Sequence, residues 1–172
     1  MLHARTAGFA LGALLALSAC QPGLNWREVR PPDSGLQALF PCKPDVEQRG
    51  AAGQRMGLAQ CETGGARYAV SWAELPDPTA AGPALAEMPR ALALKLRSPL
   101  PAPSALVVPG ATPQAQAAQY LLKGGDSTAR LAVFSRGPRV YQALRLGPAD
   151  DASARESFLG SLRLGEALRP GG

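Results

Sequence analysis

Histidine is almost missing from this chain of 172 residues, which contains only His3. His3 lies in an N-terminal segment that we expect to be removed. The mature chain then has no imidazole for a Ser-His-Asp or Cys-His nucleophilic site or for an ordinary histidine metal site. The sequence also lacks the motifs G-x-S-x-G, S-x-x-K and G-x-x-x-x-G-K-[ST]. We therefore predict no catalytic residue, no metal and no cofactor.

Aromatic residues are also scarce, at 5% of the chain, and the formal net charge of +5 is not gathered into one basic run. Lysine occurs only at positions 43, 95 and 123, and the arginines are spread along the whole sequence. A nucleic-acid-binding protein would need a basic stripe and aromatic side chains on which bases stack. We predict that nucleic acid is not a partner.

Long hydrophobic runs are absent as well. The longest uncharged apolar stretch, Ala7 to Ala19, ends with Leu17, Ser18, Ala19 and Cys20. A spanning helix needs about 20 apolar residues, so this run has the length of a signal peptide instead. Small residues directly before a cysteine are typical of a bacterial lipoprotein precursor, and an uncleaved anchor helix is the alternative.

Lipidation of Cys20 would fix the location of the protein. The resemblance to lipoprotein signals implies a thioether-linked diacylglycerol and an N-acyl chain such as palmitate on Cys20, and more than one chain gives stable anchoring. The residue after Cys20 is Gln21, whereas an aspartate there resembles an inner-membrane retention signal. We therefore expect the periplasmic face of the outer membrane, with the inner membrane as the alternative.

Two cysteines, Cys42 and Cys61, remain after Cys20 is lipidated. Because the periplasm is oxidising, an even pair in an exported chain predicts a disulfide. A redox couple or a thiol metal site is the alternative, but a zinc site needs more ligands than two thiols.

Periodicity predicts strands with helices at two places. A strand is expected over 36–40, with an edge extension over 46–49. A hairpin is expected over 55–62 and 67–74, with its turn at Gly64 and Gly65. The second strand of this hairpin should point Tyr68, Val70 and Trp72 into the core. An antiparallel meander is expected over 114–122, 129–135 and 139–146. One helix is expected from near Pro89 to Arg97. A second helix is expected after Ser153, which is predicted to form a capping box with Glu156. Trp26 is expected to dock on the domain.

These elements predict the α+β fold class: one domain with an antiparallel sheet of about five to seven strands packed by two helices. Removal of residues 1–19 leaves 153 residues, enough for one domain. The predicted organisation is a signal peptide (1–19), a lipidated tether and lead-in (20–35), a single domain (36–164) and a disordered tail (165–172).

Three segments carry a family resemblance: Trp26-Arg27 followed by Phe40-Pro41-Cys42-Lys43-Pro44, then 139–143, then 158–162. They resemble small uncharacterised proteobacterial lipoproteins and, more distantly, Mog1/PsbP-like domains. This resemblance implies an antiparallel sheet packed by helices, and mostly a binding or assembly role. It implies no functional residue, and the cysteine pair is not part of the distant pattern.

Carboxylates are the remaining candidates for chemistry, and each has a structural explanation. Asp150 and Asp151 precede a helix and Asp126 follows two glycines in a turn, so capping and turn formation explain them. Glu74 and Asp77 lie at a solvated strand end.

Basic side chains are candidates for contact with anionic lipid or lipopolysaccharide. Arg136 and Arg139 flank a turn, and a solvated hairpin tip is the alternative interpretation. Arg90, Lys95 and Arg97 on the first helix are similar, although cations near a helix C-terminus also balance the helix dipole.

We predict a membrane-anchored lipoprotein whose domain binds or helps to assemble an envelope partner, without catalysis. One alternative is a carrier of an apolar envelope ligand, which would show a large empty cavity between sheet and helices. The other is a hydrolase that uses carboxylates alone, which would show two inward carboxylates in a cleft.

Overall fold

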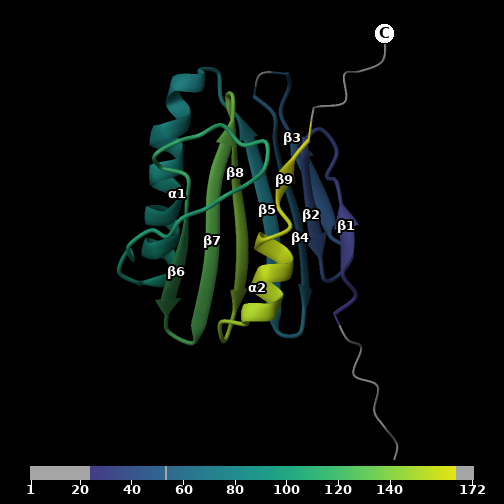
Figure 1. Cartoon of the computed structure of the whole chain (residues 1–172), viewed down its shortest axis with the longest axis vertical. Coiled ribbons are helices and arrows are strands. Elements are labelled where there is room, and N and C mark those ends of the chain that lie inside the picture. Colours follow the sequence, from purple (N-terminus) through teal and green to yellow (C-terminus); the bar gives the residue numbers. More distant parts are fainter. Residues whose placement is uncertain (1–23, 53, 166–172) are drawn as a thin grey trace, which may run out of the picture.

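A six-stranded antiparallel sheet forms the centre of the protein. The computed structural model describes residues 24–52 and 54–165, and the sheet has the strand order β3-β4-β5-β8-β7-β6 (Figure 1). The strands are β3 (Asp45–Arg49), β4 (Met56–Thr63), β5 (Ala66–Glu74), β6 (Ala118–Gly124), β7 (Ser127–Arg136) and β8 (Arg139–Gly147). The predicted signal peptide, Cys20 and positions 166–172 of the predicted tail lie outside the described residues.

The predicted hairpin is confirmed as β4 and β5. Both turn glycines have positive φ, 58° at Gly64 and 72° at Gly65, a conformation that glycine adopts without steric cost. Tyr68, Val70 and Trp72 alternate on one face of β5 and are 1%, 0% and 3% exposed. The period-two pattern therefore identified the core face of this strand correctly.

The predicted meander is confirmed as β6, β7 and β8, but β6 begins later than expected. The amide of Ala117 donates to the carbonyl of Gln114 at 3.1 Å, so the chain turns there before it enters the sheet. The outer side of β6 is partly covered, because Ser104 forms a bridge with Gln119.

A second, three-stranded sheet has the order β1-β2-β9 and consists of β1 (Arg27–Val29), β2 (Leu36–Phe40) and β9 (Arg163–Leu164). Strand β2 has its predicted bounds. The short β1 lies within the segment predicted as lead-in, and β9 was not predicted either. Trp26 docks as expected, with its ring edge-to-face against Tyr68 at 6.1 Å between centroids.

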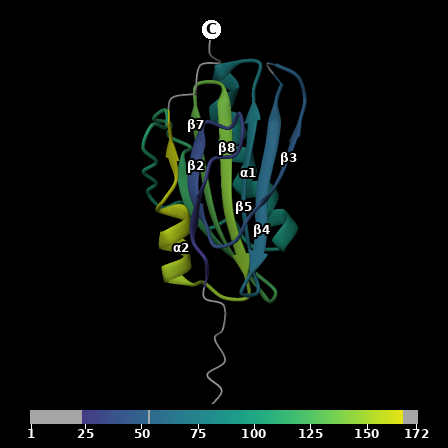
Figure 2. The ribbon, with the colours of Figure 1, turned by 90° about the vertical axis from the view of Figure 1, so that its right-hand side faces the viewer.

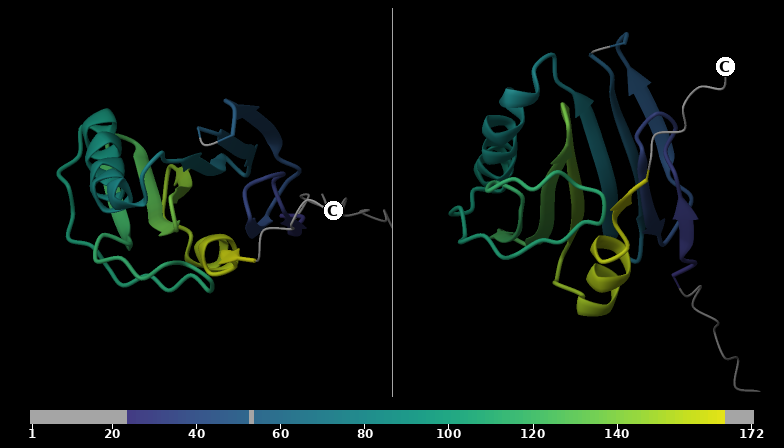
Figure 3. Two further views of the ribbon diagram at one scale, coloured as in Figure 1. Left: turned by 90° about the horizontal axis from the view of Figure 1, so that it is seen from above. Right: turned by 45° about the horizontal axis from the view of Figure 1, so that its top comes forward.

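The two faces of the large sheet are covered differently. The small sheet and helix α2 (Ala152–Leu159) pack on one face, whereas helix α1 (Ala81–Leu96) packs on the other (Figures 2 and 3). Phe158 of α2 makes edge-to-face contacts with Phe40 and Tyr68 at 5.2 and 5.4 Å. The protein is thus a single α+β domain with two antiparallel sheets and two helices.

The prediction that the first helix begins near Pro89 is wrong. Helix α1 begins at Ala81, after a short 3₁₀ turn η1 (Pro78–Ala80), and Pro89 lies inside it. Proline removes one backbone hydrogen bond, but Leu85 and Leu92 on either side of Pro89 are 0% and 9% exposed. Burial of these side chains holds the helix together through the proline. Its C-terminus is as predicted, with Arg97 in the left-handed conformation as C-cap.

The predicted capping box of Ser153 and Glu156 is wrong, because the N-cap of α2 is Asp151. Its side chain accepts a hydrogen bond from the amide of Ala154 at 3.0 Å. Aspartate is as good an N-cap as serine, so the helix begins two residues earlier than predicted. The prediction that Asp151 has a capping role is confirmed.

The predicted disulfide is confirmed. Cys42 follows β2 and Cys61 lies in β4, and their bond joins segments 19 residues apart with 6.1 Å between the Cα atoms. Cys61 is 9% exposed and belongs to the core between the large sheet and α2. The bond ties the small sheet to the large one.

Helix α1 leaves half of its sheet face open. It contacts β6, β7 and β8, as expected for one helix about 10 Å wide on strands about 4.8 Å apart. No helix among the described residues covers β3, β4 and β5 on that face. This open half holds the candidate site.

Candidate functional site

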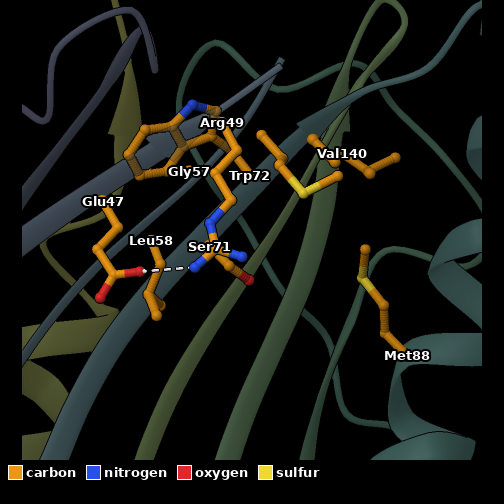
Figure 4. Close-up of a pocket in the computed structure, with 10 residues that line it drawn as sticks. Glu47, Arg49, Gly57, Leu58, Ser71, Trp72, Met88 and Val140 are labelled. Carbon is orange, nitrogen blue, oxygen red and sulfur yellow. Dashed lines mark ion pairs between the residues drawn. The ribbon is translucent and has the colours of Figure 1, made fainter. Parts of the chain in front are cut away.

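A groove of about 420 Å³ lies on the open half of the α1 face, between α1 and the hairpin of β3 and β4 (Figure 4). Its walls come from five elements: the consecutive strands β3, β4 and β5, helix α1 and strand β8. The lining residues are Glu47, Arg49, Met56, Gly57, Leu58, Ser71, Trp72, Ala73, Met88 and Val140.

Cross-strand pairing explains the shape of the groove. Met56 stands opposite Ala73, and Leu58 stands opposite Ser71. The small side chains of β5 form a low floor between the longer side chains of β4 on one side and Met88 of α1 on the other. A depression one strand wide follows from this order of large and small residues.

Gly57 and Trp72 also line the groove, although the indole ring of Trp72 lies on the core face of β5, opposite to Ser71 and Ala73. Gly57 and Trp72 pair across β4 and β5, and a Cβ atom added to Gly57 would overlap the indole ring of Trp72. Trp72 is only 3% exposed. A glycine is therefore required at position 57 for the ring to keep its place. A smaller polar recess of about 140 Å³, lined in part by Asp33 and Arg55, shares Arg49, Met56 and Trp72 with the groove.

The lining is apolar except for the β3 wall and one hydroxyl. Arg49 and Glu47 form an ion pair at 3.5 Å on that wall, and both side chains are largely exposed. Such a pair contributes little to stability, but it sets a polar border on the groove. Met56 is 52% exposed, so a thioether that is flexible enough to fit varied shapes is accessible here.

Ser71 carries the one hydroxyl group of the lining, and no histidine or lysine lines the groove beside it. Most of the lining is apolar, and its two charged side chains, Glu47 and Arg49, pair with each other. The groove is thus chemically suited to holding apolar groups.

The candidate carboxylates lie at two ends of the large sheet, Glu74 and Asp77 at one end and Asp126 and Asp150 at the other. The Asp77 carboxylate accepts from the Thr79 amide at 2.8 Å, and this hydrogen bond lowers the pKa of Asp77. Glu74 lies 3.7 Å from the guanidinium of Arg139. Asp126 follows Gly125, whose φ is 56°, in the turn between β6 and β7.

Asp150 binds two arginines. Its carboxylate accepts from Arg130 at 3.0 and 2.5 Å and lies 3.3 Å from Arg155. The hydrogen bond from Arg130, more than any other effect, lowers the pKa of Asp150. The group is therefore held as a carboxylate that joins β7 to the start of α2.

Arg136 and Arg139 face each other across the turn between β7 and β8. Arg139 donates to the carbonyl of Asp33 at 2.7 Å, and Arg136 donates to the carbonyl of Gly165. Both guanidinium groups thus bind the domain itself. Their contact with an anionic surface stays a prediction.

Sequence reasoning missed one buried cation. Arg145 is 5% exposed, donates to the carbonyl of Ala149 at 2.8 Å and lies over the ring of Tyr68 at 5.7 Å. Nothing in the sequence indicated that Arg145 is buried, because the alternating pattern of β8 is the same whether or not the residue at position 145 is charged.

The groove was missed as well, although part of its signal was present. Met88 lies one residue before the start predicted for the first helix. Met56 and Leu58 lie on the face of β4 opposite Ala59 and Cys61, which belong to the core, and an apolar pair on that face is a sign of a second buried or binding surface.

Comparison of the sequence with protein-family models finds no match, and comparison with curated proteins finds none either. Over residues 24–52 and 54–165, no helix is long and apolar enough to cross a membrane. The same residues contain no group of three or more histidine, cysteine or acidic side chains placed to hold a metal ion.

Proposed function

We propose that the protein is a bacterial lipoprotein, acylated on Cys20 and anchored at the periplasmic face of the outer membrane, whose domain binds an envelope partner without catalysis. The supporting observation is the apolar groove beside α1. It lies on the half of the sheet that no described helix covers, so a partner can reach it without opening the core.

The chemistry of the groove points to an amphipathic partner segment. Met56, Leu58 and Met88 offer apolar contact, while the ion pair of Glu47 and Arg49 offers polar contact at the outer wall. The open half of the sheet has room for one helix beside α1, since packed helices lie 8–10 Å apart. A helix with one apolar stripe fits both the width and the chemistry.

We also propose a Mog1/PsbP-like architecture. Support comes from the antiparallel sheet with helices on its two faces, and from the position of the three resembling segments. Trp26, Phe40 and Phe158 of those segments belong to or pack against one core.

A carrier of an apolar ligand is the second candidate, because the same groove is apolar and its volume lies in the range of small-molecule sites. The groove is a surface feature with Met56 half exposed, whereas a carrier would be expected to enclose its ligand between sheet and helices. The binding module is therefore favoured.

A photocrosslinking amino acid at position 56 tests the proposal in living cells, and the same residue at position 94 is the control. Leu94 is 82% exposed on the outer side of α1. We expect position 56 to yield one discrete protein adduct that position 94 does not. Equal adducts at both positions contradict the groove as the binding site, and a phospholipid adduct at position 56 supports the carrier.

A charge substitution in the groove tests whether the groove is needed for function. Met56→Glu places a carboxylate in the groove, and loss of one buried methionine contact, about 1.5–3 kcal/mol, weakens binding roughly 10-fold to 100-fold. Leu94→Glu is the matched control. We expect the first variant, at normal protein level, to fail to complement a deletion strain and the second to complement it.

A further inference from the structure

The short chain between Cys20 and Leu24 determines which end of the domain faces the membrane. This inference rests on the proposed acylation of Cys20. Three residues lie between Cys20 and Leu24, and a fully extended chain spans at most about 3.6 Å per residue step, so over four steps the two Cα atoms lie within about 14 Å. Leu24 must therefore stay close to the bilayer surface.

Leu24 lies at one end of the large sheet, beside the turn between β4 and β5. Its Cδ2 atom would be 3.8 Å from a Cβ atom added to Gly64, and the next residue, Asn25, donates its amide to the carbonyl of Pro41 at 3.1 Å. Strand pairing brings the β6–β7 turn and the β8–α2 connection to the same end (Figure 1, lower end). We call these segments the Leu24 end.

Helix α1 also ends there. The backbone of Gly124 approaches the carbonyl of Leu96 so closely that a Cβ atom would overlap it. This contact places the C-terminal end of α1, with Lys95 and the C-cap residue Arg97, at the same end of the sheet as Lys123, the residue before Gly124. All three cations are exposed, and no ion pair joins any of them to an acidic side chain of the described residues.

The acidic groups at this end are largely engaged. Glu62 pairs with Arg67 at 2.5 Å, and Asp150 pairs with Arg130 and Arg155. Asp151 caps α2. Asp126 in the β6–β7 turn is the acidic side chain that offsets the positive charge of these cations most directly. The patch of Lys95, Arg97 and Lys123 therefore keeps a positive excess.

We propose that this basic patch and Leu24 lie against the anchoring bilayer, where Lys95, Arg97 and Lys123 bind phosphate-bearing lipid headgroups. An exposed leucine supports this contact, because Leu100, three residues after Arg97, is 46% exposed. Near an anionic membrane each such cation contributes about fivefold to binding, equivalent to about 1 kcal/mol.

The groove lies toward the opposite end of the sheet. Trp72 is six residues along β5 from Ala66, which is about 20 Å at the usual rise per residue. Lipid chains of the anchoring bilayer therefore do not reach the groove, and its occupant comes from the periplasm. The turn of Arg136 and Arg139 also lies at this distant end, since Arg139 pairs with Glu74.

Depth-dependent quenching tests the orientation in the acylated full-length protein. The protein is placed in vesicles of phosphatidylethanolamine and phosphatidylglycerol that contain a headgroup-spin-labelled lipid. A fluorophore is attached through Ala149→Cys at the Leu24 end or through Ala51→Cys in the β3–β4 loop at the far end. Both alanines are exposed, so the two variants are matched.

We expect strong quenching at position 149 and near-background quenching at position 51. The triple variant Lys95→Gln, Arg97→Gln, Lys123→Gln should lose most of the quenching at position 149 in anionic vesicles. A triple variant with the same charge change at other sites, Arg30→Gln, Arg49→Gln, Arg55→Gln, should not.

Equal quenching at the two positions, or stronger quenching at position 51, overturns the orientation while the lipoprotein proposal stands. An unchanged signal in the Lys95 triple variant overturns the role of the basic patch. Absence of acyl mass on the purified protein overturns the proposed anchoring and this inference together, so intact mass is measured first.

Discussion

Removal of the disulfide should lower the free energy of unfolding by about 3 kcal/mol. The bond closes a loop with a sequence separation of 19 residues. For a loop of that length the chain-entropy relation gives about 11 cal/mol/K of lost unfolded-state entropy, or about 3.3 kcal/mol at 25 °C. The double substitution Cys42→Ala, Cys61→Ala in a Cys20→Ser background removes this constraint, and urea denaturation followed by circular dichroism measures the result.

Packing of the sulfur atoms must be separated from the loop constraint, because Cys61 is 9% exposed in the core. The oxidised parent protein treated with reductant keeps both sulfurs and loses only the bond. We expect most of the loss in the reduced parent, with a larger dependence of the unfolding free energy on urea, since the unfolded chain expands. A loss below about 1 kcal/mol in the reduced parent refutes the loop-constraint argument.

Three further changes test the fold around the site. Gly57→Ala should lower stability by about 1–3 kcal/mol, because the added Cβ displaces the ring of Trp72, and tryptophan fluorescence should shift. Asp151→Ala should lower stability by about 1 kcal/mol in thermal melts through loss of the α2 N-cap, and an unchanged melting temperature would count against the cap. The pKa of Asp150 is lowered from 3.8 in the folded state, so Asp150 stabilises the fold above pH 3.8, and this stabilisation is lost as the pH falls through the folded pKa. Asp150→Asn should therefore reduce the fall of the unfolding free energy at acid pH. An unchanged fall would contradict the pairing with Arg130.

Local patterns predicted the central strands because each strand buries one face. Tyr68, Val70 and Trp72 alternate, and Gly64 with Gly65 permits only a tight turn, so residues close in sequence determine the hairpin. The disulfide was predictable from cysteine number and compartment. These signals need no knowledge of the rest of the chain.

Features that depend on distant contacts were not predictable. Pro89 disfavours a helix locally, but burial of Leu85 and Leu92 on the sheet outweighs the lost hydrogen bond. Strands β1 and β9 are too short to show a period and exist only because each pairs with β2. The groove requires Met56 and Met88 to face each other across β5, a relation that the one-dimensional pattern does not contain.

The anchoring of the domain through Cys20 is the central claim, and intact-mass spectrometry of the membrane-extracted protein tests it most directly. The account predicts a chain that begins at Cys20 and carries acyl groups, and a Cys20→Ser variant that leaves the membrane fraction. A wild-type protein without acyl mass, together with a Cys20→Ser variant that stays in the membrane at the wild-type level, would contradict it.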